Sequence, residues 1–156
     1  MRLSICKTVA SRRSLRYAGL CTLIIVVAVG CSGKRYNPIG DYRYTCYDDK
    51  GNVVAGGRIS ITSSEVGRVG SEEQTQFKGD WELIKVDEQA RAGMQEGKGE
   101  LTGSLNKGEI KVNLNPNTSA AVILRGEIED KGFHGTWSCD CYVGPVVTGK
   151  FEAVKR

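Results

Sequence analysis

The sequence contains little proline and histidine, 3 and 1 residues among 156, and no apolar run as long as the roughly 20 residues of a spanning helix. No stretch shows a clear helical period either, apart from one or two turns over 87–94. With 40% hydrophobic and 26% charged residues, the chain has the composition of a folded protein, so collagen-like, fully disordered and multi-span membrane classes are excluded. The length suits one domain, and the absence of helical periodicity indicates that this domain consists of strands.

Acidic residues are absent from residues 1–30. Of the 22 basic residues, five lie there, which leaves 17 bases and 18 acids in the remainder. The formal charge of the remainder is therefore −1, against +4 for the whole chain. Binding of nucleic acid through a basic surface loses its main support, and no nucleic-acid partner is expected. The five basic residues are Arg2, Lys7, Arg12, Arg13 and Arg16.

The N-terminal segment has the layout of an export signal, with a basic stretch followed by an apolar run over 20–29. The last two residues of this run and the two that follow it, Ala28-Val29-Gly30-Cys31, resemble the lipobox of bacterial lipoproteins. In that family the cysteine is lipidated and becomes the first residue of the mature protein. The resemblance implies a signal peptide over 1–30, palmitate on Cys31, and a lipid-anchored location in the cell envelope. The alternative is an uncleaved single-span anchor over the uncharged stretch 17–33.

The residue after the cysteine is Ser32 rather than Asp. By the lipoprotein family's sorting rule, this implies the outer membrane, facing the periplasm, if the source has two membranes. Residues 31–40 contain glycine, proline and basic residues and are interpreted as a flexible tether, which leaves 41–156 as the domain.

From residue 41 onward, apolar and polar residues alternate with period two, as in strands with one buried face. The alternation predicts eight short strands, near 42–46, 53–61, 77–83, 99–105, 110–114, 122–128, 133–141 and 149–153. Asp49-Lys50-Gly51, Asn106-Lys107-Gly108 and Asp130-Lys131-Gly132 repeat one turn design, a type I turn with a glycine of positive φ. Longer links are expected over 63–73, 87–97, 115–119 and 143–146. The repeated turns therefore predict that strands consecutive in the sequence pair antiparallel to each other.

Six glycines are placed on the inward face, two residues before a large apolar residue. Inward glycines let a sheet coil into a small barrel, so we predict a closed eight-stranded up-and-down barrel, with a two-sheet β-sandwich as the alternative. The architecture is similar to that of avidins and lipocalins. Gly79-Asp80-Trp81 and Gly135-Thr136-Trp137 resemble the Gly-x-Trp of their first strand, but fall on the third and seventh strands here, so only the architecture is carried over. The six glycines are Gly57, Gly79, Gly103, Gly126, Gly135 and Gly149.

Three cysteines remain in the domain, Cys46, Cys139 and Cys141, in a compartment that permits disulfides. In a closed meander, a bridge from the first strand to the seventh spans two strand spacings, more than a disulfide tolerates. Either the barrel is flattened at this seam, or Cys139 pairs with Cys141. The hypothesis is a bridge from Cys46 to Cys141 or Cys139.

Metal and catalytic sites have weak signals. His134 alternates onto the polar face, opposite the cysteines, so no metal site is expected. The acidic turn beginning at Asp48 lacks the ligand spacing of a calcium loop. The inward face has no acid, base or serine, so the chain is not expected to be an enzyme and no cofactor is expected, although a hydrolase with a loop-borne site is a remote alternative.

Inward aromatic residues are the candidates for an apolar pocket, with core filling as the competing interpretation. We therefore expect a lipid-anchored binding or assembly module with an envelope protein as partner, and, as the alternative, a carrier of a small apolar ligand. The rim at the end away from the tether, with Met94, Pro116, Val143, Pro145 and Val146, is the expected recognition surface. The aromatic residues are Tyr42, Tyr44, Phe77, Trp81, Phe133, Trp137 and Phe151.

Overall fold

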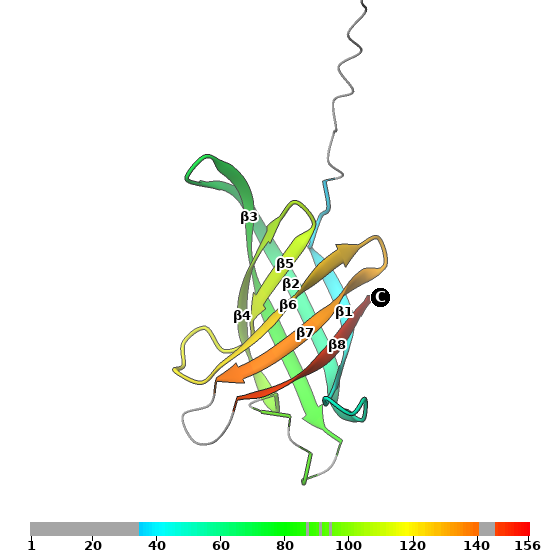
Figure 1. The fold of residues 1–156 in the computed structure, drawn as a ribbon. Helices are drawn as coiled ribbons and strands as arrows, with labels where there is room; N and C mark the ends of the chain where they lie inside the picture. Colours follow the sequence, from blue (N-terminus) through cyan, green and yellow to red (C-terminus); the bar gives the residue numbers. More distant parts are fainter. Residues whose placement is uncertain (1–34, 87, 91, 94, 141–145) are drawn as a thin grey trace, which may run out of the picture. The chain divides into compact units, whose positions relative to one another are not determined.

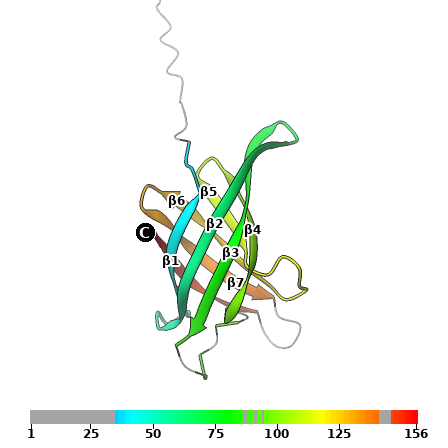
Figure 2. The same cartoon turned by 180° about the vertical axis from the view of Figure 1, so that it is seen from behind.

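The computed structural model describes residues 35–86, 88–90, 92–93, 95–140 and 146–156. They form eight strands: β1 (Gly40–Tyr47), β2 (Val53–Val69), β3 (Glu72–Lys85), β4 (Gly97–Asn106), β5 (Glu109–Asn113), β6 (Ala121–Glu129), β7 (Gly132–Asp140) and β8 (Val147–Lys155). Each strand pairs antiparallel with the next, and β8 pairs with β1, so the sheet closes into a barrel (Figures 1 and 2). The predicted eight-stranded barrel is confirmed, and the sandwich is wrong. Within the described residues, no helix has the length and hydropathy to span a membrane.

The period-two alternation determines which side chains are buried. In β1, Tyr42, Tyr44 and Cys46 point inward and are buried, while the residues between them are partly or fully exposed. The same alternation continues around the ring, so one apolar core fills the barrel. Burial of these side chains is the main stabilising contribution to the fold.

A Phe-x-Gly-x-Trp sequence occurs twice, at 77–81 in β3 and at 133–137 in β7. In the first copy, Trp81 lies opposite Gly99 of β4, where the missing side chain leaves room for the indole. The indole nitrogen donates a hydrogen bond to the carbonyl of Leu114, the residue after β5. The tryptophan thus links three neighbouring strands from inside.

The second copy repeats this arrangement on the opposite side of the ring. Trp137 lies opposite Gly149 of β8, and its indole nitrogen donates to the carbonyl oxygen of Tyr47, the last residue of β1, at 2.9 Å. The bond therefore crosses the seam at which the two ends of the sheet meet.

The first turn follows the predicted design, whereas the β4–β5 and β6–β7 connections each have only two residues between the last paired residues of their strands. Gly51 has φ of 87° and closes the turn between β1 and β2 as expected. At the β4–β5 turn, both Lys107 and Gly108 have positive φ, 50° and 93°. That connection has two residues with the twist of a type I′ hairpin, not a type I turn with a bulge, because the strands pair up to Asn106 and Glu109.

The predicted long link over 63–73 is wrong. β2 and β3 continue as a paired hairpin up to Val69 and Glu72, joined by a two-residue turn. This hairpin, residues 62–75, extends past the neighbouring strands and is called the arm (Figure 1, upper left). It shows no apolar alternation because it lies beyond the core and has no buried face.

The connections fall at two ends of the barrel. The tether enters β1 at one end, which also has the arm and the turns at 107–108 and 130–131; we call it the tether end. The turn at 48–52, the link at 114–120, the described residues of the link at 86–96 and Val146 before β8 lie at the other end, the far end.

Candidate functional site

The seven aromatic residues proposed as pocket lining are all buried, with 3% or less of each residue exposed. Four of them pack on one another: the ring centroids of Tyr42 and Phe133 are 4.9 Å apart, and those of Phe133 and Phe151 are 5.8 Å apart. Tyr44 stacks on Phe151 at 5.9 Å. Phe77 also lines a small cleft of about 220 Å³ beside β2 and β3. The aromatic side chains therefore fill the core, which leaves them little role in a ligand pocket.

At the tether end, the barrel mouth is covered by the segment that leads into β1. The Tyr42 hydroxyl donates a hydrogen bond of 2.6 Å to the carbonyl of Pro38. Tyr36 of the same segment packs partly buried against the core. Tyr36 and Pro38 of the tether thus lie over this mouth of the barrel and contact its core.

At the far end, the link between β3 and β4 enters the barrel mouth. Its Gln95 is fully buried and accepts a 2.5 Å hydrogen bond from the Tyr44 hydroxyl at Oε1. The Gln95 amide nitrogen donates to the carbonyl of Ala92, which is also buried. Sequence reasoning missed Gln95, because a single polar residue in a polar, glycine-containing link gives no signal of burial.

Cys46 is a buried free thiol, and Cys139 is disulfide-bonded. The predicted bridge from Cys46 is therefore wrong. β8 lies between β1 and β7, so the two strand spacings exceed the reach of a disulfide. Burial is the largest cause that raises the pKa of the Cys46 thiol to about 11. Cys141 lies outside the described residues, as does Cys31.

The weaker metal candidates remain separate in space. His134 lies on the outer face, with its Nδ1 4.0 Å from a Glu129 oxygen. Within the described ranges, no three histidine, cysteine or acidic residues come together as metal ligands. The Asp48 carboxylate accepts hydrogen bonds from Asn52 and from the Lys50 backbone, and the Asn52 contact is the main cause that lowers its pKa. That carboxylate stabilises its own turn.

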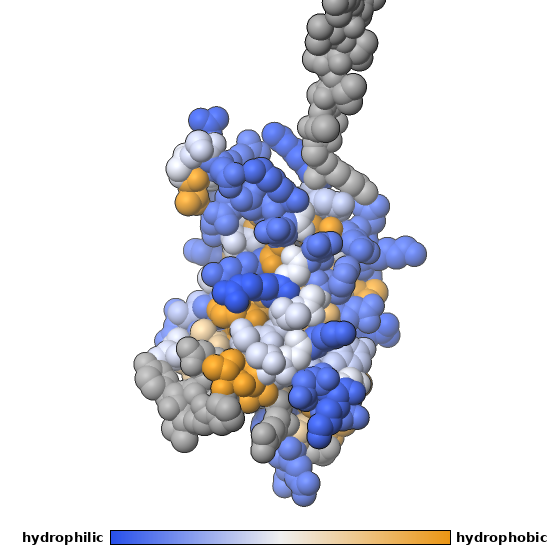
Figure 3. Space-filling view, in the orientation of Figure 1, coloured by the Kyte–Doolittle hydropathy of each residue, from blue (hydrophilic) through white to orange (hydrophobic). Residues whose placement is uncertain are grey.

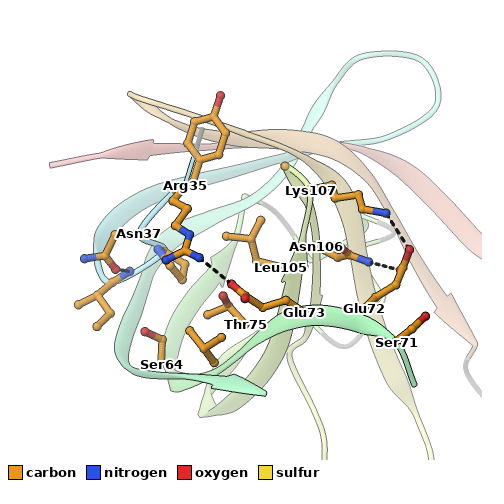
Figure 4. Close-up of a pocket in the computed structure, with 15 residues that line it drawn as sticks. Arg35, Asn37, Ser64, Ser71, Glu72, Glu73, Thr75, Leu105, Asn106 and Lys107 are labelled. Atoms are coloured by element: carbon orange, nitrogen blue, oxygen red, sulfur yellow. Dashed lines mark hydrogen bonds and ion pairs between the residues drawn. The ribbon is translucent and has the colours of Figure 1, made fainter. Parts of the chain in front are cut away.

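The larger clefts lie at the two ends. A cleft of about 730 Å³ separates the tether from the arm and the β4–β5 turn (Figure 4). The arm closes one side of it through Glu72, which accepts from Lys107 at 2.7 Å and from Asn106 at 3.0 Å. On the other side, Arg35 of the tether lies 3.4 Å from Glu73. The Asn106 Oδ1 atom is buried and has no hydrogen-bond partner among the described residues.

Glu72 and Lys107 are paired in this cleft, and the pairing moves the pKa of each away from neutral pH. The hydrogen bond from Lys107 is the largest cause that lowers the pKa of Glu72 and, in return, raises that of Lys107. A general acid or base needs a pKa near the working pH. Glu72 and Lys107 are therefore poorly suited to proton transfer.

The far-end cleft, of about 860 Å³, lies between the β1–β2 turn, the β3–β4 link and the start of β8. It includes Val146, the described member of the predicted recognition rim that lines it. Met94, Val143 and Pro145 lie outside the described residues. The cleft is mixed in character, because its lining includes the charged Asp48 and Lys50 as well as four valines, at 53, 54, 146 and 147.

Large exposed apolar side chains also gather at the ends. Val53, Ile84, Val86 and Val146 lie at the far end, and Ile39, Val66 and Val69 lie at the tether end. The face of the barrel shown in Figure 3 is mostly hydrophilic, with hydrophobic atoms at the tip of the arm at upper left. Exposed apolar groups near one another are typical of contact surfaces. The two ends are therefore the candidate binding surfaces.

Comparisons of the chain with protein-family models, curated proteins and solved structures give no match. The function is accordingly argued from the residues and their geometry.

Proposed function

We propose that the chain is a lipid-anchored protein of the cell envelope whose barrel acts as a non-catalytic binding or assembly module. The anchor is palmitate on Cys31, supported by the lipobox-like sequence 28–31. With Ser32 next in the sequence, the proposed location is the outer membrane, facing the periplasm, in a source with two membranes. The partners are the membrane and an envelope protein.

The observation that carries this proposal is the contrast between a filled interior and apolar ends. The core aromatics pack together, and Gln95 and Pro38 contact tyrosines at the two mouths. A carrier needs interior volume, commonly a few hundred Å³, so the filled core argues against the carrier alternative. In the tether-end cleft Glu72 and Lys107 are engaged in an ion pair, which does not favour a hydrolase built on these two residues.

The far end is the proposed protein-binding surface. Ile84 and Val86 point outward near the end of β3 and are 71% and 59% exposed. Val86 donates its backbone N–H to the carbonyl of Val54, which places these side chains beside the far-end cleft. If the tether enters from the membrane, this end faces away from it and is open to a partner.

Site-specific photocrosslinking in intact membranes tests the protein-binding role. A photoreactive residue at position 84 is expected to give a discrete adduct with an envelope protein, and Val86→Asp is expected to reduce its yield at least tenfold. The control has the photoreactive residue in place of Lys111, on the exposed face of β5, and should give no adduct. Equal adducts from both positions, or none from position 84, would refute the proposal.

The anchor and the carrier alternative need separate measurements. The mass of the mature N-terminus is expected to show an acylated Cys31, and an intact Met1 or an unmodified Cys31 overturns the anchor. Native mass spectrometry of the purified barrel is expected to show the bare polypeptide mass. A retained small apolar molecule would support the carrier instead.

A further inference from the structure

The arm is the element that extends furthest past its neighbouring strands at the tether end. β1 pairs with β2 only as far as Ile61, yet β2 continues to Val69, about eight residues or 26 Å further. β4 pairs with β3 as far as Thr75, and β3 begins at Glu72, about 10 Å beyond. By contrast, the turns at 107–108 and 130–131 are short.

The tip of this arm is held beside the tether. Glu73 lies opposite Arg68, in the second residue pair from the turn, and its carboxylate is 3.4 Å from the Arg35 guanidinium. Glu72, in the first pair, contacts Lys107 at 2.7 Å (Figure 4). Exposed ion pairs such as these contribute little free energy. They nevertheless show that the tip and the tether approach each other.

The tether also limits how far the tip can lie from the anchor. From Cys31 to Arg35 the chain spans at most about 14 Å, because an extended chain advances no more than about 3.6 Å per residue. If Cys31 is lipidated, Arg35 lies within that distance of the bilayer surface. The arm tip, in contact with Arg35, then lies close to the lipid headgroups.

The chemistry of the tip suits this position. Val66 and Val69 are 67% and 63% exposed, on either side of Arg68. The three acids of the arm, Glu65, Glu72 and Glu73, are matched in number by Arg68 and by Arg35 and Lys107 nearby. Binding at the boundary between headgroups and acyl chains increases with the apolar area buried there, and a tip with balanced charge adds neither net attraction to anionic lipid nor net repulsion from it.

We propose that the arm tip rests on the bilayer that holds Cys31, with Val69 and Val66 in contact with the lipid. This inference rests on the proposed lipid anchor. The arm provides a second membrane contact beside the lipid, and two contacts restrict the tilt of the barrel. The far end, with Ile84 and Val86, is then held away from the membrane.

Tryptophan quenching by brominated lipid tests the contact. Residues 31–156 are suitable, because the barrel closes within 40–155 and residues 1–30 take no part in its pairing. The protein is coupled through Cys31 to a maleimide phospholipid in phosphatidylcholine vesicles, with the coupling site checked by peptide mass. The buried Cys46 thiol, with its pKa of about 11, is shielded from the reagent.

The probe is Ser71→Trp in the exposed turn of the arm, and Asp49→Trp in the far-end turn is the matched control. Brominated phosphatidylcholine is expected to reduce the added emission of Ser71→Trp at least twofold and to leave that of Asp49→Trp unchanged. The native Trp81 and Trp137 are buried, so the parent protein supplies a constant background. Adding Val66→Ser and Val69→Ser is expected to remove most of the quenching.

Three results would overturn the inference. If the emission of Ser71→Trp is quenched as weakly as that of Asp49→Trp, the arm lies away from the bilayer. Quenching that persists undiminished without the two valines assigns the contact to other residues. Crosslinks between arms of two copies, found in place of quenching, identify a dimer contact and also overturn it. Because the synthetic lipid replaces the cellular one, these results do not depend on acylation in the cell, which the mass of the mature N-terminus tests separately.

Discussion

The sharpest test of the barrel's packing is Gly149→Ala, at the seam between β8 and β1. A methyl carbon added there would lie 1.9 Å from the Tyr47 carbonyl oxygen and 2.6 Å from the Trp137 indole nitrogen. The carbonyl is fixed by the pairing of β1 with β8 and accepts the Trp137 hydrogen bond. The clash therefore cannot be relieved by a side-chain rotation.

The expected cost follows from two contributions. Overpacking a core typically costs about 1–3 kcal/mol, and an unpaired buried donor costs roughly 1–3 kcal/mol more. Gly149→Ala should therefore lower the free energy of unfolding by about 2–6 kcal/mol. The matched variant is Gly99→Ala, for which the three atoms nearest to the methyl group are ring atoms of Trp81, all at 3.1 Å, so its cost should stay near 1 kcal/mol.

Urea unfolding followed by tryptophan fluorescence measures both values, with Gly56→Ala as the control. At Gly56 the nearest atom to an added methyl group is 3.4 Å away, and the expected change is within about 1 kcal/mol. Equal slopes of the unfolding curves would show that the native states are comparable. Equal costs for Gly149→Ala and Gly99→Ala would refute the assignment of the clash to the fixed carbonyl.

Two further predictions concern the far-end core. Tyr44→Phe removes the donor to the buried Gln95 oxygen, so it should cost roughly 1–3 kcal/mol in the same urea assay; an unchanged stability would show that this bond does not hold the link. Cys46 has a pKa near 11 in the fold against an ordinary 9.0, so the folded protein keeps a proton that the unfolded chain loses. The contribution of the protonated thiol to the free energy of unfolding is fully present below pH 9 and falls by up to about 3 kcal/mol between pH 9 and 11. Cys46→Ala should flatten this decline of stability with pH. An equally steep decline in the variant would contradict the assignment of the decline to Cys46.

The barrel could be predicted from the sequence because apolar and polar residues alternate regularly along its strands. In β1 every second residue is apolar, and a period of two admits only one assignment of faces. The inward glycines were equally informative: Gly149, one of the six, lies where Trp137 of the neighbouring strand needs the space. These signals are local, so they are present in the sequence before any fold is known.

The arm and the closure of the far end could not be predicted from the sequence, for different reasons. Val66 and Val69 lie in a polar stretch with no buried face, so a paired hairpin and a loop have the same pattern. Gln95 is buried by a link that crosses the mouth, and its partner Tyr44 is far away in the sequence. The cysteine prediction failed although the ring geometry already opposed it, since β8 separates Cys46 from Cys139.

The pairing of β1 with β8 has a consequence for how the molecule folds. It places Tyr42 opposite Lys155, so the ring closes only when the two ends of the domain meet. Contacts this distant in sequence carry a large loop-closure entropy and slow the folding of small domains. Until β8 is in place, β1 and β7 each present an open edge to other chains. Once closed, the ring has no edge from which unpairing can begin, so slow unfolding should protect the folded protein as much as its equilibrium stability does.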